Sequence, residues 1–194
     1  MKKCHFSVKG FTLIELMVTV ALVAVLMAVA VPSMTTFQRN AQLTSFSNTL
    51  LSAINAARGE AMKRGQSAMV VPTDGSNWSS GWVVFVDLDR SQTYSETTDF
   101  TVLKREAPPS YLAITVTGTA SATPPYILFD ASGYAKNKAG GFPGNQSFNI
   151  KRSDATGIDE FAQTRRIKIA STGRVRVCTP KSGSDAQCNA SSGL

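Results

Sequence analysis

The stretch that decides the fold lies at residues 9–31 and reads KGFTLIELMVTVALVAVLMAVAV. From residue 11 to residue 31 its only charged side chain is Glu15. A helix crosses the hydrocarbon core of a bilayer with roughly 20 predominantly apolar residues. Residues 11–31 are therefore predicted to form a transmembrane segment.

Basic residues around this run predict its orientation. Lys2, Lys3 and Lys9 precede it, and the next basic residue is Arg39. Positive charge is retained on the cytoplasmic side of a membrane, so the start of the chain is predicted to stay in the cytoplasm and the rest to be exported. The alternative is an ordinary secretory signal, which ends in a small-residue cleavage site, whereas here Pro32 follows the run.

Gly10, Phe11 and Glu15, together with the short basic leader and Pro32, resemble the class III signal of type IV pilins and pseudopilins. The resemblance implies that a prepilin peptidase removes residues 1–10 by cutting between Gly10 and Phe11, and that the new N-terminal Phe11 is then methylated. It also implies that Glu15 helps to set the register of assembly, because it pairs with an amine that belongs largely to a neighbouring subunit.

The physics of Glu15 supports a pairing role independently. A carboxylate inside a spanning helix costs about 2.5–3.5 kcal/mol on insertion scales, so it needs a partner. Cleavage after Gly10 creates an α-amino group on Phe11, four residues before Glu15. Residues four apart lie on the same side of a helix, so we expect the two groups to face each other.

Helical periodicity resumes directly after Pro32, although this residue and Ser33 would break or kink a helix. Apolar residues then recur every three or four positions, at Leu43, Phe46, Leu50, Ile54, Ala57 and Ala61. Such a stripe needs a folded surface to cover it. Lys63 and Arg64 suit the C-terminal end of a helix, and Gly65 suits its cap. The helix is therefore predicted to run from residue 11 to residue 64.

After Gly65 the pattern changes to the alternation that is typical of strands, with turn-rich separators. Strands are predicted at residues 68–71, 81–87, 102–105, 112–116, 126–129, 148–151, 166–170 and 174–178. Residues 65–194 are therefore predicted to form an antiparallel β domain that packs on the helix stripe. The predicted fold class is α+β, with a long N-terminal helix and a C-terminal β domain.

Three strings in the β region resemble the GspH/FimT branch of the type IV pilins: GWVVFVD at 81–87, ILFDASG at 127–133 and RIKIASTGRVRVC at 166–178. The resemblance implies the type IV pilin fold and a minor pilin that promotes pilus assembly at or near the pilus tip. It implies other major and minor pilins, prepilin peptidase and an inner-membrane assembly platform as partners. It also implies a single-pass protein of the bacterial inner membrane whose C-terminal domain is periplasmic, and extracellular once it is part of the pilus. Two alternatives stay open: a purely structural minor pilin and a pseudopilin of a type II secretion system.

The composition argues against an enzyme. The chain of 194 residues is 43% hydrophobic and 17% charged, which is typical of a folded protein. The only histidine, His5, lies in the leader with Cys4, so the processed chain has no histidine. This excludes a Ser-His-Asp triad, a Cys-His dyad and any zinc site that contains histidine. We predict no catalytic residue, no metal and no cofactor.

Two pairs of residues are given structural interpretations. Asp87 and Asp89 have the chemistry of calcium ligands, but a hairpin turn is the favoured interpretation. Trp82 opens an apolar strand and is predicted to lie in the core. Trp78 stays open between the core and an exposed platform for a ring-shaped ligand.

The C-terminal end carries most of the positive charge. Residues 161–194 contain one acid, Asp185, and six basic residues: Arg165, Arg166, Lys168, Arg174, Arg176 and Lys181. Strand alternation places Arg166, Lys168, Arg174 and Arg176 on one face of a hairpin. One interpretation is a solvated face that protects a sheet edge from aggregation. Like charges on facing strands repel, so we favour an anionic partner that offsets this repulsion.

The string GRVR at 173–176 resembles the Gly-Arg-x-Arg motif of FimT-type minor pilins. The resemblance implies that Arg174 and Arg176 hold double-stranded DNA during natural transformation. Arg166 and Lys168 are predicted to belong to the same DNA-binding face.

Two cysteines, Cys178 and Cys188, remain after removal of the leader, and nine residues separate them. Disulfides form in exported domains, whereas thiols stay reduced in the cytosol. We therefore predict a disulfide that closes a C-terminal loop.

Overall fold

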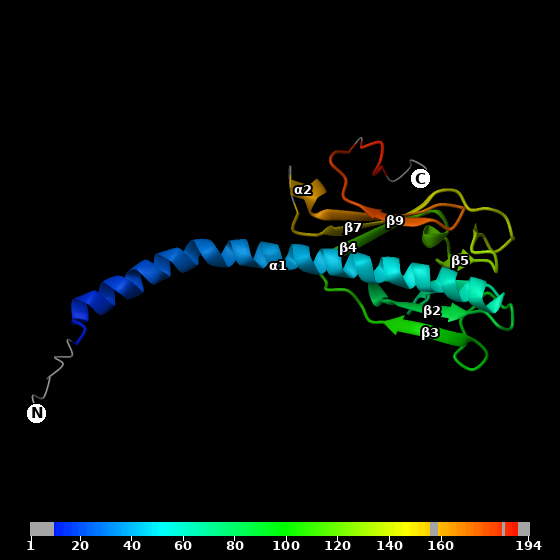
Figure 1. Cartoon of the computed structure of the whole chain (residues 1–194), viewed down its shortest axis with the longest axis horizontal. Coiled ribbons are helices and arrows are strands. Elements are labelled where there is room, and N and C mark those ends of the chain that lie inside the picture. The colour runs from blue at the N-terminus through cyan, green and yellow to red at the C-terminus, as the bar shows by residue number, and fades with distance from the viewer. Residues whose placement is uncertain (1–9, 156–158, 184, 190–194) are drawn as a thin grey trace, which may run out of the picture. The chain divides into compact units, whose positions relative to one another are not determined.

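The computed structural model of this chain describes residues 10–155, 159–183 and 185–189 (Figure 1). The predicted leader, apart from Gly10, lies outside the described residues. One long helix, α1 (Leu13–Arg64), is followed by nine strands and short helical turns. Contacts divide the chain into two compact units, residues 1–39 and 40–194, which are described separately below.

Helix α1 begins and ends at identifiable caps. The Thr12 hydroxyl accepts the backbone N–H of Glu15 at 3.3 Å, and its carbonyl accepts that of Leu16 at 3.2 Å. This is the N-cap arrangement with an acidic residue three positions later. At the other end Gly65 has a φ of 64°, the left-handed conformation that closes many helices. The backbone is helical throughout α1, including residue 32.

The first unit exposes its apolar side chains. Phe11 is 82% exposed, and the other side chains described between residues 10 and 39 are exposed as well. Within the described residues, no helix is both long enough and apolar enough to cross a membrane.

The second unit contains two antiparallel sheets (Figure 1). Sheet A has the strand order β3-β2-β1-β5-β6, and sheet B has the order β4-β7-β8-β9. The strands of sheet A are β1 (Ala68–Pro72), β2 (Trp82–Val86), β3 (Phe100–Arg105), β5 (Ile127–Phe129) and β6 (Ala135–Lys136). Those of sheet B are β4 (Leu112–Thr117), β7 (Gln146–Arg152), β8 (Thr164–Ile169) and β9 (Val175–Cys178). The short helices are η1 (Trp78–Ser80), η2 (Gly118–Ser121) and α2 (Asp159–Ala162).

The stripe of α1 packs with both sheets in the larger of two hydrophobic clusters in the described part of the chain. The stripe residues Leu43, Leu50, Ile54, Ala57 and Ala61 are buried among strand residues, and Phe46 packs at the edge of this core. The antiparallel β domain packed on a long helix is therefore confirmed. Each predicted strand is present with small shifts at its ends, and the strand missed was β6, which is too short for alternation to be visible.

Both tryptophans belong to the core, which decides the question left open for Trp78. Its ring lies 4.7 Å from that of Phe148 in an edge-to-face arrangement, and its indole N–H donates to the Ala120 carbonyl at 2.8 Å. The Trp82 ring lies 5.4 Å from that of Phe46. Neither ring is available as an exposed platform, because both side chains are buried.

Candidate functional site

Sheet B has one apolar face and one polar face. Residues such as Phe148, Ile150 and Ile167 point into the core, so their neighbours along each strand point the other way. Strand register arranges these neighbours in rows, with Thr115 opposite Asn149 and Asn149 opposite Arg166. We call this surface the polar face of sheet B; it comprises Ala113, Thr115, Thr117, Ser147, Asn149, Lys151, Thr164, Arg166, Lys168 and Arg176.

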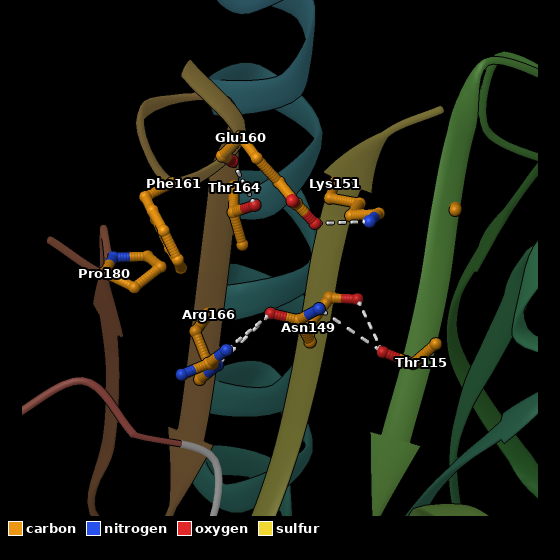
Figure 2. A pocket seen from close by; sticks show the side chains of 9 residues that line it. Thr115, Asn149, Lys151, Glu160, Phe161, Thr164, Arg166 and Pro180 are labelled. Carbon is orange, nitrogen blue, oxygen red and sulfur yellow. Dashed lines mark hydrogen bonds and ion pairs between the residues drawn. The ribbon is translucent and has the colours of Figure 1, made fainter. Parts of the chain in front are cut away.

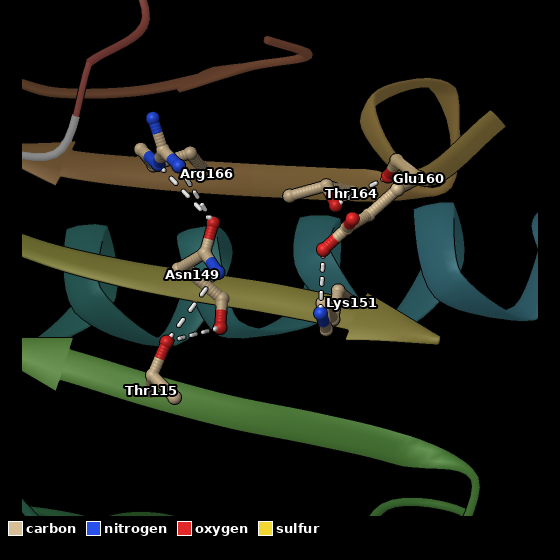
Figure 3. Close-up of polar contacts among 6 residues, drawn as sticks. All are labelled: Thr115, Asn149, Lys151, Glu160, Thr164 and Arg166. Atoms are coloured by element: carbon tan, nitrogen blue, oxygen red, sulfur yellow. Dashed lines mark hydrogen bonds and ion pairs between the residues drawn. The ribbon is translucent and has the colours of Figure 1, made fainter. Parts of the chain in front are cut away.

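Arg166 lies half-buried at the centre of the polar face (Figure 3). Its Nε and Nη2 atoms donate to Asn149 Oδ1 at 3.2 and 3.0 Å, and its Nη1 atom donates to the Cys188 carbonyl. Burial lowers the pKa of Arg166, and the charge of Asp185 opposes this shift. Among the described residues, the acceptors of this guanidinium are thus neutral oxygens.

Lys168 is not on an exposed surface as predicted, because its exposed fraction is 1%. It lies directly opposite Arg176 in the register of β8 and β9. Burial lowers the pKa of Lys168, and the positive charges of Arg176 and Arg166 lower it further. Alternation placed the side chain on the correct face, but periodicity does not report burial. The chain after β9 returns to this face, where the carbonyls of Gln187 and Cys188 accept from Arg176 and Arg166.

The returning segment is tied down at both ends. Cys178 at the end of β9 forms a disulfide with Cys188, and their Cα atoms are 5.9 Å apart. The Asp185 carboxylate accepts the backbone N–H groups of Lys181 and Gln187 at 2.9 and 3.0 Å. These backbone hydrogen bonds lower the pKa of Asp185. The segment is therefore held as a compact loop.

The two arginines of the GRVR string differ in their surroundings. Arg174 lies directly before β9, is exposed, and its carbonyl accepts the backbone N–H of Ala170 at 2.9 Å, which continues the pairing of β8 with β9 by one position. Arg176 lies in β9, is half-buried, and donates from Nη2 to the Gln187 carbonyl. Its Nε atom is buried and has no partner among the described residues.

The glycine of the same string has a backbone role. Gly173 has a φ of 79°, and a Cβ atom at this position would lie 1.9 Å from the Gly133 carbonyl oxygen. A side chain cannot be accommodated there without moving the turn. The glycine therefore follows from the close packing of two turns and needs no ligand to explain it.

A hollow of about 250 Å³ opens on the polar face beside Arg166 (Figure 2). Its floor includes Thr115, Asn149, Lys151, Thr164 and Arg166, and its walls are Glu160 and Phe161 of α2 and Pro180 of the C-terminal loop. The Lys151 ammonium lies 2.6 Å from Glu160 Oε1. We call this hollow, with its floor and walls, the α2 hollow. Sequence reasoning missed it because α2 is one turn long and Pro180 reaches the site only through the loop.

The acidic pair considered as calcium ligands belongs to a larger turn cluster. Asp99, which was not predicted, joins Asp87 and Asp89, and oxygen atoms of the three carboxylates lie within 4.8 Å of one another. Burial raises the pKa of Asp87. Asp87 accepts the backbone N–H groups of Ser91 and Gln92, both at 3.0 Å. These bonds order the connection of residues 87–99 between β2 and β3, which pair as antiparallel neighbours.

The predicted alignment of Phe11 with Glu15 concerns the processed chain and stays a prediction, because the chain described here is uncleaved at Gly10. Gly10 and Phe11 precede the helix, which begins at Leu13 after the Thr12 cap. Phe11 therefore does not lie one turn above Glu15. The expectation assumed a helix that begins at the new N-terminus, whereas here the chain continues through Gly10.

Comparisons with known proteins define the class. The prokaryotic N-terminal methylation motif matches residues 6–31. Two crystal structures of the type IV minor pilin FimU from Pseudomonas aeruginosa strain PAO1 share the fold, each with a TM-score of 0.50 at 14% identity. The match covers 73% of this chain and 92% of FimU in one crystal form, and 70% and 91% in the other. The fold is therefore that of the type IV pilins.

The family follows from the β domain and the helix before it. The family described as type II transport protein GspH matches residues 47–188, which is most of the chain. The chain belongs to the GspH family and is a GspH/FimT-like minor pilin or pseudopilin. No curated protein sequence matches it.

Proposed function

We propose that this chain is made as a prepilin of the bacterial inner membrane, cut between Gly10 and Phe11, methylated on Phe11 and assembled at or near a pilus tip. The N-terminal methylation motif supports this because its match, residues 6–31, covers the end of the leader, the cleavage position and the apolar run. The exposed apolar side chains of the first unit support it as well, since surfaces of this kind are normally covered by a membrane or by partner subunits.

Mass spectrometry of the protein extracted from membranes tests the processing step. We expect loss of ten residues and gain of one methyl group. Gly10→Leu should block cleavage, whereas Glu15→Ala should be cleaved normally and then assemble poorly, because only the second removes the charge that needs a partner. An intact leader in a host with active prepilin peptidase would refute the proposal.

A pseudopilin of a type II secretion system is the second candidate function. The description of the matched family, type II transport protein GspH, favours it. Deletion of the gene separates the two candidates. Loss of pili with normal protein secretion supports the minor pilin, and loss of secretion with normal pili supports the pseudopilin.

We further propose that the basic end of sheet B, which comprises Arg166, Lys168, Arg174 and Arg176, binds double-stranded DNA, as in natural transformation. One observation carries this proposal. Among the described residues, Arg166 and Arg176 donate to neutral amide and carbonyl oxygens and not to a carboxylate. Both lie on the same face of sheet B as the buried Lys168. Arg174 is exposed and able to reach a phosphate directly. Lys168 was expected to contact DNA, but it is buried. We therefore assign it a different role: it adds positive potential from beneath the surface and does not touch DNA.

The contacts in this proposal are to phosphates. The short helix α2 has four residues and α1 buries its stripe in the core, so neither is placed to read bases in a major groove. Binding through phosphates carries no direct sequence information. We therefore expect weak binding with little sequence preference.

Fluorescence anisotropy with a labelled duplex and the full chain in detergent tests DNA binding. Arg174→Ala should weaken binding to all duplexes alike. Arg105→Ala is the matched control, because Arg105 is also exposed but lies at the end of β3 in sheet A. Equal affinities of the two variants would refute a role for the basic end of sheet B.

A further inference from the structure

The α2 hollow contains positive charge that this chain compensates only in part. Arg166 and Lys151 line it together with one acid, Glu160. Lys151 and Glu160 pair at 2.6 Å, but their side chains are 37% and 41% exposed, so solvent screens this pair and a stronger anion can displace it. Arg166 has Asn149 and the Cys188 carbonyl as its acceptors in the described part of the chain. The hollow is therefore suited to an anionic group.

The floor of the hollow also offers hydrogen-bonding groups that are weakly engaged. Arg166 holds the Asn149 amide oxygen, so the amide nitrogen points toward Thr115 (Figure 3). The contacts between Asn149 and Thr115 are long, at 3.4 and 3.5 Å. A ligand with donors and acceptors on its edge can therefore take up these groups without breaking a strong bond.

One wall of the hollow is apolar. Phe161 extends from α2 and Pro180 lies beside it (Figure 2). An aromatic ring next to cationic side chains is the combination with which proteins bind single-stranded nucleic acid, since the ring stacks on a base and the cations hold the phosphate. The volume of about 250 Å³ is small for a ligand pocket. It is large enough to hold a single base.

We propose that the α2 hollow binds a single unpaired nucleotide of a DNA strand, with its phosphate between Arg166 and Lys151 and its base against Phe161. This inference rests on the proposed DNA binding and adds to it a site for single-stranded or frayed ends. Asn149 and Thr115 face the edge of the base. Arg166 belongs to both sites, whereas Phe161 belongs to the hollow alone, so we expect duplex binding through Arg174 and Arg176 not to need the Phe161 ring.

Two labelled probes separate the hollow from the duplex site: a 12-nucleotide oligothymidylate and a blunt 12-base-pair duplex, each titrated with the full chain in detergent at the same salt concentration. Phe161→Leu keeps an apolar wall but removes the ring, so it should weaken binding of the single strand about five- to tenfold. It should change duplex binding less than about twofold. Phe142→Leu is the control, because Phe142 is an exposed ring that lies outside the hollow.

A third probe, thymidine 5′-monophosphate, tests the hollow without reference to DNA binding. Hydrogen exchange of the full chain should slow in the segments that contain Thr115, Asn149 and Phe161 when the nucleotide is added, and Arg166→Gln should abolish this protection. Unchanged exchange there, or unchanged single-strand affinity of Phe161→Leu, overturns the inference. If neither DNA probe binds but the nucleotide slows hydrogen exchange in the hollow, the proposed DNA binding is refuted and the proposed nucleotide site is retained.

Discussion

Sheet B places two arginines in contrasting surroundings. Arg152, at the end of β7, is buried and donates to both oxygens of Asp154 at 3.0 and 2.7 Å and to Asn40 Oδ1 at 3.0 Å. Arg166, on β8, is half-buried and donates to an amide oxygen and a backbone carbonyl. The pKa of Arg152 is raised, chiefly by its hydrogen bonds to Asp154, whereas burial lowers the pKa of Arg166.

This difference makes Arg152 a structural cation, whereas Arg166 is available to an external anion. The chain supplies a carboxylate where an arginine stabilises the fold, and it supplies neutral oxygens on the polar face of sheet B. Neutral oxygens solvate a guanidinium but leave its charge in place, so an external anion gains from binding there. This contrast is the physical basis for placing the DNA-binding site on the polar face.

Removal of Arg152 should have the largest effect on stability. Arg152→Ala leaves Asp154 without its partner and opens space beside Asn40. We expect a loss of about 2–3 kcal/mol, below the value for a fully buried pair because water reaches Asp154. Urea denaturation measures this loss. Arg166→Ala is the control and should lose less than about 1 kcal/mol, because it breaks bonds to neutral acceptors near the surface; equal losses would remove the contrast between the two arginines.

Loss of the disulfide should have the next largest effect, and it acts on the polar face. For a loop of this length chain entropy gives at most about 2–3 kcal/mol, and less if the denatured state retains structure. Cys178→Ser combined with Cys188→Ser should therefore lower the urea midpoint and loosen the segment that supplies carbonyls to Arg166 and Arg176. Lys168 should then react faster with an acylating reagent, as read by mass spectrometry. Unchanged Lys168 reactivity would show that the loop is not what buries it.

The smallest predicted effect concerns pH and Asp185. Its folded pKa is lowered by backbone N–H donors, so its contribution to stability is present above the ordinary value of 3.8 and is lost as the pH falls through the folded pKa. Asp185→Ala should therefore melt at a lower temperature than the parent at pH 7 and at nearly the same temperature at pH 2. A melting difference that is the same at both pH values would contradict this assignment.

Much of the fold follows from local patterns in the sequence. The stripe from Leu43 to Ala61 specified the buried side of α1, and alternation located the strands of sheet B because each has one face in the core. Strand β2 of sheet A is buried along its whole length, so its apolar run marked it as a strand. The cap at Gly65 was predicted from the sequence, but not the one at Thr12, whose hydroxyl caps the helix three residues before Glu15. The start of the helix at Leu13 could have been predicted from that spacing.

The site could be predicted only in part, because periodicity tells which face a side chain occupies and not what covers that face. Lys168 and Arg176 were placed on one face correctly, but Gln187 and Cys188 return to that face and accept from Arg176 and Arg166 through contacts that no local pattern encodes. The α2 hollow has the same origin, since Phe161 and Pro180 meet strands β4 and β7 only in three dimensions.

The salt dependence of duplex binding tests the central claim, that uncompensated cations at the basic end of sheet B hold DNA phosphates. For three to five phosphate contacts, the slope of log affinity against log salt should be about −3 to −4.5 for the parent chain. Arg174→Ala combined with Arg176→Ala removes two contacts, so the slope should become shallower by about 1.8 and the affinity should fall for every duplex tested. Thermal stability should stay the same or rise slightly as repulsion is relieved. An unchanged slope and affinity in the double variant would contradict the claim and identify the basic residues as a solvated surface of a structural minor pilin.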